Sequence, residues 1–181
     1  SMDPNHPQSY GNRGNVYDAN GEYEKAVADY SKAIELKPDY ADAYFNRAST
    51  FMKLRKYHDA EADFRKLLQI APDDAAAAAS LAEIFLITSK LPELKKLLED
   101  YRNMLSKKNY MPLVVFYEAA LKLLAGEPDT SKETAMVRSA AEKFGKTQWD
   151  FTEITSWAAT APISPEVTSA VLGMIDILKK G

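Results

Sequence analysis

Few side chains in this chain of 181 residues have the types and spacing that catalysis or metal binding requires. The two histidines, His6 and His58, stand far apart in the sequence. The chain contains no cysteine, which excludes disulfides, thiol catalysis and cysteine-ligated zinc. His58 falls at the start of a predicted helix, where we expect a polar surface residue. The acidic pair Asp73-Asp74 resembles half of a metal site when it is viewed in isolation.

Motifs that bind nucleotides or activate a nucleophile are absent from the sequence. It has no P-loop, no Gly-x-Gly-x-x-Gly and no nucleophile elbow. The pairs Lys95-Lys96 and Lys107-Lys108 are typical of solvated helix faces. A net charge of −3 and an isoelectric point near 5.5 argue against a surface for nucleic acid or anionic membrane. We therefore predict that the chain is not an enzyme, uses no metal or cofactor, and binds neither nucleic acid nor membrane.

The strongest pattern in the sequence is a repeat with a period of 34 residues. The first set of repeated residues is Tyr10, Gly14, Tyr17, Ala26, Tyr30, Ala33 and Pro38. The matching set, 34 positions later, is Tyr44, Ala48, Phe51, Ala60, Phe64, Leu67 and Pro72. Self-similarity at this period indicates an array of stacked helical hairpins, whose extended concave surface is suited to holding a partner.

Each repeat unit is predicted to contain two amphipathic helices. The spacing of apolar residues and the positions of Gly and Pro predict helices over residues 8–19, 23–36, 41–54 and 57–70. A third, degenerate unit over residues 75–108 keeps Leu81, Phe85 and Leu98 in phase. It has Leu94 where the second helix normally carries a small residue, and it lacks the closing proline.

Helix signals continue beyond residue 108, although the register of the repeat is lost. Helices are predicted over residues 112–124 and 130–144, with a short helix opened by Thr147-x-x-Asp150 and a last helix from Ser164-Pro165 to about Lys180. The chain is thus predicted to be all-α with about ten helices. Residues 7–108 form three repeat units, and residues 109–181 form degenerate hairpins that continue or cap the solenoid. A separate small bundle after residue 110 is the alternative.

The last predicted helix is unusually apolar for a terminal helix, because its polar strip is narrow. We predict a capping or self-association surface at Val171, Met174, Ile175 and Leu178. Three explanations stay open: this helix packs into the interior of the array, it forms a homodimer, or the natural chain continues past Gly181.

The repeated segments resemble the tetratricopeptide repeat (TPR) family. GNVYDANGEYEKAVADYSKAIELKPD and ADAYFNRASTFMKLRKYHDAEADFRKLLQIAPDD carry nearly the whole family pattern, clearly over residues 7–74 and more weakly to 108. The resemblance implies a right-handed superhelix of helical hairpins. It also implies that Asp73-Asp74 caps the helix that follows, because the family needs a capping residue in that loop.

In the family, ligands lie against inward-facing residues of the first helix of each pair. The resemblance therefore implies a peptide-binding groove at Asn15, Asp18, Phe45, Asn46, Ser49, Met52, Lys53, Glu83 and Leu86. The apolar members could grip a hydrophobic side chain or an amphipathic helix. Alternatively, later helices curl back and bury them.

TPR co-chaperones that bind the C-terminal carboxylate of heat-shock chaperones use a clamp of lysines, asparagines and an arginine. Asn15 and Asn46 match the two asparagines of that clamp, whereas Gly11, Ala76 and Ser80 stand at its cationic positions. A carboxylate needs charge-assisted partners to offset its desolvation, so we expect no tight binding of those C-termini. The asparagines can still hydrogen-bond the backbone of an extended peptide. Arg13 and Arg47 stand at equivalent places and are expected to pair with neighbouring acids.

The sequence thus predicts a non-catalytic scaffold or adaptor that binds a peptide, a helix or a protein surface in its concave groove. The alternatives are a homo-oligomeric assembly module that uses the last helix and a regulatory arm of a larger enzyme. No motif identifies the ligand, the oligomeric state or the compartment, although a cytoplasmic location is favoured.

Overall fold

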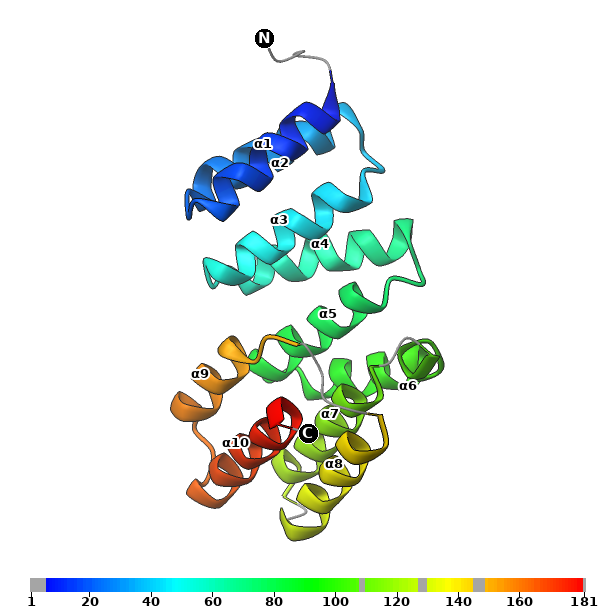
Figure 1. Ribbon diagram of the computed structural model, residues 1–181, viewed down its shortest axis with the longest axis vertical. Helices are drawn as coiled ribbons and strands as arrows, with labels where there is room; N and C mark the ends of the chain where they lie inside the picture. The colour runs from blue at the N-terminus through cyan, green and yellow to red at the C-terminus, as the bar shows by residue number, and fades with distance from the viewer. Residues whose placement is uncertain (1–5, 108–109, 127–129, 145–148, 181) are drawn as a thin grey trace. The chain divides into compact units, whose positions relative to one another are not determined.

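The computed structural model describes residues 6–107, 110–126, 130–144 and 149–180, and within these ranges it contains α-helices and no strand (Figure 1). The helices are α1 (Pro7–Ala19), α2 (Tyr23–Leu36), α3 (Ala41–Lys53), α4 (Tyr57–Ile70), α5 (Ala75–Ile87), α6 (Leu91–Lys107), α7 (Met111–Leu124), α8 (Thr130–Phe144), α9 (Thr152–Thr160) and α10 (Pro165–Lys180). The prediction of an all-α helical-hairpin fold is confirmed. None of these helices is both long and apolar enough to cross a membrane.

The chain divides into two compact units, Ser1–Leu81 and Ala82–Gly181, and the boundary falls inside α5. The first unit contains the two complete hairpins α1–α2 and α3–α4. The second contains the end of α5 and α6 to α10. The predicted division after Lys108, a residue outside the described ranges, stays a prediction.

Small residues allow the helices of each hairpin in the first unit to approach closely. A Cβ atom added to Gly14 of α1 would lie 2.7 Å from Cε1 of Tyr30 in α2. Ala26 is fully buried beside this contact, and its equivalent in the second hairpin, Ala60, is fully buried as well. The repeated residues are therefore mainly packing residues, as the sequence pattern indicated.

The turns inside successive hairpins have the same backbone geometry at intervals of 34 residues. Gly21, Arg55 and Ser89 all have positive φ, at 76°, 56° and 56°. The amide of the residue after each donates to a carbonyl oxygen in the last turn of the preceding helix, each at 2.8 Å: Glu22 to Tyr17, Lys56 to Phe51 and Lys90 to Phe85. The third pair, α5 and α6, therefore keeps the turn of the repeat although its sequence is degenerate.

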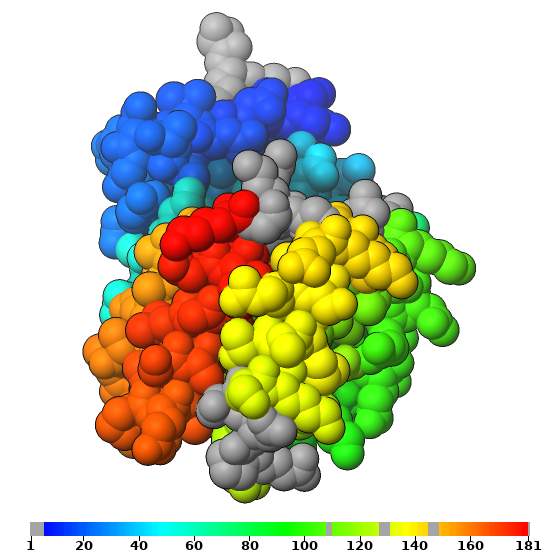
Figure 2. Space-filling model, turned by 60° about the horizontal axis from the view of Figure 1, so that its bottom comes forward, coloured from blue at the N-terminus to red at the C-terminus, as the bar shows by residue number. Residues whose placement is uncertain are grey.

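The apolar face of the last helix packs against other helices of the second unit, and its polar face is exposed. α10 packs against α8, with further contacts to α7 and α9, and Figure 2 shows it (red) between α8 (yellow) and α9 (orange). The four side chains predicted as a capping or oligomer surface are almost fully buried: Val171, Met174, Ile175 and Leu178. Of the three explanations for this apolar helix, the structure shows burial. The surface assignment of these residues is corrected accordingly.

Helix α9 begins later than the sequence predicted. Thr147, the expected first capping residue, lies outside the described residues. Asp150 Oδ1 accepts hydrogen bonds from the amide of Thr152 at 2.9 Å and from its hydroxyl at 2.6 Å. Trp149 and Phe151 therefore precede the helix, and Phe151 is buried with its ring 6.0 Å from that of Phe116. At α10 the predicted cap is confirmed, because the amide of Val167 donates to Ser164 Oγ at 3.3 Å.

Candidate peptide-binding groove

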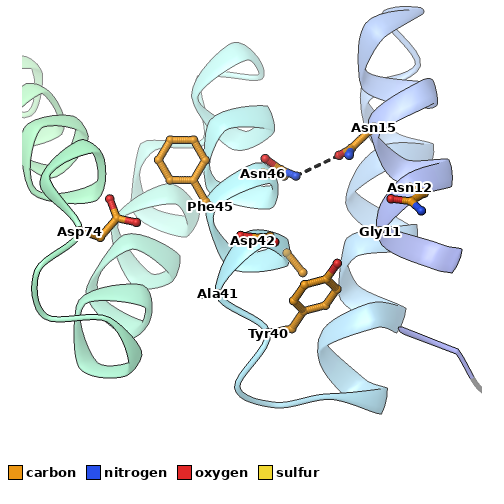
Figure 3. A pocket seen from close by; sticks show the side chains of 10 residues that line it. Gly11, Asn12, Asn15, Tyr40, Ala41, Asp42, Phe45, Asn46 and Asp74 are labelled. Atoms are coloured by element: carbon orange, nitrogen blue, oxygen red, sulfur yellow. Dashed lines mark hydrogen bonds between the residues drawn. The ribbon is translucent and has the colours of Figure 1, made fainter. Parts of the chain in front are cut away.

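A hollow of about 240 Å³ opens in the first unit along α1, α3 and the start of α5 (Figure 3). It is lined by Gly11, Asn12, Asn15, Tyr40, Ala41, Asp42, Ala43, Phe45, Asn46 and Asp74. Three of the predicted groove residues, Asn15, Phe45 and Asn46, lie in this lining. The structure thus brings the two asparagines and the aromatic ring of the predicted groove together.

A chain of hydrogen bonds orients the two asparagine side chains. The hydroxyl of Tyr30 donates to Asn15 Oδ1 at 2.8 Å, and Asn46 Nδ2 donates to the same oxygen at 2.9 Å (Figure 3). Because an amide has distinct donor and acceptor ends, these bonds define which way each side chain points. Among the described residues, the side-chain atoms Asn15 Nδ2 and Asn46 Oδ1 have no hydrogen-bond partner. The pair therefore offers one donor and one acceptor to the hollow.

Asp18 and Lys53, two further predicted groove residues, bind each other, one turn after Asn15 on α1 and two turns after Asn46 on α3. Lys53 Nζ forms an ion pair with Asp18 Oδ2, and the Thr50 hydroxyl lies 2.9 Å from Asp18 Oδ1. The Lys53 ammonium also lies 5.5 Å from the centre of the Tyr23 ring. These contacts tie α1 to α3 and neutralise the Lys53 charge, so this lysine is not a free anchor for an anionic ligand.

The other predicted groove residues of α3 are partly buried, and some of their side chains contact other residues of the first unit. Ser49 Oγ donates to the carbonyl oxygen of Phe45 at 2.9 Å, within the same helix. Met52 is half-buried. The Phe45 ring packs edge-on against Phe64, with ring centres 5.7 Å apart, which fixes the ring beside the hollow. Phe45 is therefore the predicted apolar residue that the structure places in position to contact a ligand.

The two predicted groove residues of α5 are buried, and a later part of the chain contacts one of them. Leu86 is fully buried, and Glu83 is 5% exposed. Trp149 Nε1 donates to Glu83 Oε2 at 3.2 Å, and the Trp149 ring packs on Tyr110. Glu83 and Leu86 are therefore not open to a ligand. The alternative that later segments curl back holds for this part of the predicted groove.

Burial controls the charge of Glu83. Desolvation, with smaller contributions from the nearby carboxylates of Asp150 and Glu153, raises the pKa of its carboxyl from 4.5 to about 8. The hydrogen bond from Trp149 opposes this shift only in part. Glu83 is therefore mainly protonated at neutral pH, which makes its burial tolerable without a cation.

The positions that would carry clamp cations hold no charge. At Gly11, an added Cβ would lie 3.4 Å from the ring and the hydroxyl of Tyr40, which covers this part of α1. Ser80 is buried and Ala76 half-buried. The two arginines at equivalent repeat positions form ion pairs with neighbouring acids, as expected. Arg13 pairs with Asp29 and Arg47 with Asp63, each through two hydrogen bonds of 2.6 to 2.7 Å.

Sequence reasoning missed part of the lining and one positioning residue. Tyr40 and Asp74 come from the loops between hairpins, and the predicted groove was drawn only from helix positions. Asp42, in the first turn of α3, is a further lining residue outside the predicted set. Asp74 also accepts from the amide of Ala77 at 2.9 Å, which confirms the predicted cap of α5. Tyr30, one of the repeated residues, is also outside the predicted set, although its hydroxyl orients Asn15.

Comparison with known proteins gives one family. Its TPR repeat profile matches residues 14–55, and its tetratricopeptide repeat profile matches residues 41–74. No curated protein sequence matches the chain.

Several solved structures share the fold. YrrB, described as a TPR protein with an unusual peptide-binding site, is 18% identical over 96% of this chain and 87% of its own, with a TM-score of 0.63. The TPR domain of Arabidopsis OM64 is 25% identical over 64% of this chain and 93% of its own (TM-score 0.54). The TPR2B domain of yeast Sti1, solved as a complex with pHsp70, is 18% identical over 76% of this chain and 97% of its own (TM-score 0.52). The resemblance drawn from the sequence is confirmed.

Proposed function

The chain is a tetratricopeptide repeat protein, and we propose that it is a non-catalytic scaffold or adaptor that binds an extended peptide segment of another protein in the hollow along α1 and α3. The observation that carries this proposal is the oriented asparagine pair beside Phe45. One amide donor and one amide acceptor match the alternating C=O and N–H groups of an extended peptide, and the aromatic ring can pack on a side chain of that peptide.

Similar proteins support a peptide or protein partner. YrrB is described as having a peptide-binding site, and the Sti1 domain was solved with pHsp70. A ligand that ends in a free carboxylate fits this chain less well, because no cation lines the hollow and Lys53 is paired with Asp18. We therefore expect the C-terminal carboxylates of heat-shock chaperones to bind weakly.

The alternative of an assembly module loses its main support. The side chains on which it depended are in the core of the second unit, as for Met174 and Leu178, which are fully buried. Pairing through them would require α10 to leave its place.

The proposal is tested by selecting peptides from a random library displayed on phage and measuring the affinity of the selected peptides by fluorescence anisotropy. Phe45→Ala and Asn46→Ala each remove one part of the proposed contact, and we expect affinity losses of about tenfold or more. Val16→Ala is the matched control, since Val16 lies on α1, is 58% exposed and does not line the hollow. Equal binding by all of these proteins, or no selected peptide, would overturn the proposal. Circular dichroism confirms that each variant is folded.

A further inference from the structure

The hollow along α1 and α3 is acidic. Among its ten lining residues, Asp42 and Asp74 are the charged ones, and both carry negative charge. The asparagines and the aromatic rings that complete the lining are neutral. An electronegative concave site in a surface of lower dielectric concentrates cations.

Three cations of α1 and α3 are paired with carboxylates that do not line the hollow. Lys53 is paired with Asp18, Arg13 with Asp29, and Arg47 with Asp63. Lys37 contacts one lining residue, with its ammonium 5.4 Å from the centre of the Tyr40 ring. None of these ion pairs involves Asp42 or Asp74, so the charge of the hollow is not neutralised by a side-chain pair that the structure describes.

Neither lining carboxylate is paired with a cation among the described residues, although one of them caps a helix. Asp74 uses Oδ1 to cap α5, through the amide of Ala77. Asp42 is exposed in the first turn of α3. Each of these two helix N-termini carries roughly half a positive charge, which offsets part of the nearby carboxylate and leaves the hollow negative.

The arrangement of the lining suits a long cationic side chain. Figure 3 shows the Phe45 ring between Asp74 at the start of α5 and Asn46 on α3. A peptide whose backbone bonds the asparagines can lay the aliphatic stem of a side chain on Phe45, and its charged end can then reach a carboxylate. At about 240 Å³ the hollow is smaller than the roughly 300–1,000 Å³ of pockets that hold a whole ligand, so it fits one side chain.

We propose that this hollow selects peptides that present a lysine or arginine side chain to Asp42 and Asp74. The inference rests on the proposed function, because it names the chemistry of the peptide that the same groove takes. The charge of this ligand is opposite to the charge expected from the two clamp-like asparagines alone. The family clamp holds a carboxylate with cations, whereas carboxylates line the site in this chain.

The test uses the whole chain and a random library of octapeptides that are acetylated at the N-terminus and amidated at the C-terminus, so that no terminal charge contributes. We expect the retained peptides to be enriched in lysine or arginine at one position. Replacing that residue by norleucine keeps the aliphatic stem and removes the charge, and we expect affinity to fall about tenfold, with a smaller loss at high salt.

Matched variants assign the effect to the hollow. Asp42→Asn combined with Asp74→Asn removes the charge, and asparagine can still cap α5. We expect this double variant to bind the cationic peptide about tenfold more weakly and the norleucine peptide as the wild type does. Asp73→Asn, an exposed neighbour that does not line the hollow, should change neither affinity by more than about twofold.

The outcomes separate the two proposals. If selected peptides are neutral or acidic, or if the double variant binds the cationic peptide as tightly as the wild type, the inference is wrong. In that case sensitivity to Phe45→Ala would still support a peptide-binding groove. If no peptide is retained, or if Phe45→Ala has no effect, the proposed function and this inference both fail.

Discussion

Tyr30 connects the packing of the repeat to its groove through a single side chain. Its ring fills the space that Gly14 leaves on α1, and its hydroxyl fixes the amide of Asn15. Asn15 in turn accepts from Asn46 on the next hairpin. A change at the packing end is therefore expected to reach the ligand-binding end.

The first prediction concerns Gly14. Glycine in a helix interior is normally less stable than alanine by about 1 kcal/mol. At this position a Cβ would lie 2.7 and 2.9 Å from two atoms of the Tyr30 ring, which is 1% exposed and cannot move freely. We expect Gly14→Ala to destabilise the chain by about 1–3 kcal/mol in urea unfolding.

Gly173 provides the matched control, because it is an exposed glycine of α10 with no atom within 4 Å of an added Cβ. Gly173→Ala should stabilise by about 0.5–1 kcal/mol. If both substitutions changed the free energy of unfolding in the same direction, the close contact between Gly14 and Tyr30 would not control stability.

The second prediction concerns the pH dependence caused by Glu83. Its pKa is about 8 in the folded chain, against 4.5 for an ordinary glutamate, so the folded state retains a proton that the unfolded state releases. Stability should therefore fall as pH rises from about 4.5 to 8, by up to about 1.4 kcal/mol per pH unit, and then level off.

Glu83→Gln removes this titration and keeps an acceptor for Trp149. Urea midpoints measured across the same pH range should become less dependent on pH, and the variant should be more stable than the wild type at the alkaline end. Glu142→Gln, an exposed change on α8, should leave the slope unchanged. A wild-type slope that persists in Glu83→Gln would assign the pH dependence to another group.

At the scale of elements, equivalent arginines join the two helices of each hairpin in the first unit. Arg47 binds Asp63 of α4 and also donates to Ser31 of α2 at 2.8 Å, and its side chain is 19% exposed. Its equivalent, Arg13, binds Asp29 of α2 and is 44% exposed. The carboxylate side chains of Asp63 and Asp29 are similarly buried, with exposed fractions of 7% and 9%.

The third prediction follows from this difference in exposure. Arg47→Leu leaves Asp63 buried without its cation, and we expect a loss of about 3 kcal/mol. Arg13→Leu should cost less, about 1 kcal/mol, because water already reaches that ion pair. Denaturant unfolding of the two variants checks the order, and an equal or larger loss for Arg13→Leu would contradict it.

The sequence predicted the elements of the first unit closely because their signals are local. The helix-turn periodicity and the prolines gave bounds for α2 and α4 that match the structure at both ends. The start of α9 was predicted wrongly, since Asp150 caps the helix from two residues before it. The burial of Glu83 could not be predicted from neighbouring residues either, because its partner Trp149 lies 66 residues further along the chain.

At the scale of the whole molecule, apolar surface decides whether copies of the chain associate. Among the described residues, the large hydrophobic side chains that are exposed are Val16, at 58%, and Phe144, at 43%. They lie on different helices, α1 and α8, and single exposed apolar residues are normal for a monomer. The four apolar residues of α10 for which the sequence suggested a dimer surface are buried against helices of their own unit.

The fourth prediction is therefore that the chain has a mass of 20.2 kDa in light scattering, unchanged over a hundredfold range of concentration.

Met174→Ala distinguishes a core role of α10 from a role as an interface between copies. Because Met174 is fully buried, its truncation should destabilise the chain by about 2–5 kcal/mol and leave the mass unchanged. If the wild type instead doubled in mass as concentration rose, and Met174→Ala reduced that association at a concentration where the variant is folded, α10 would be an interface between copies. The burial seen within one chain would then describe a state that gives way when a second copy binds.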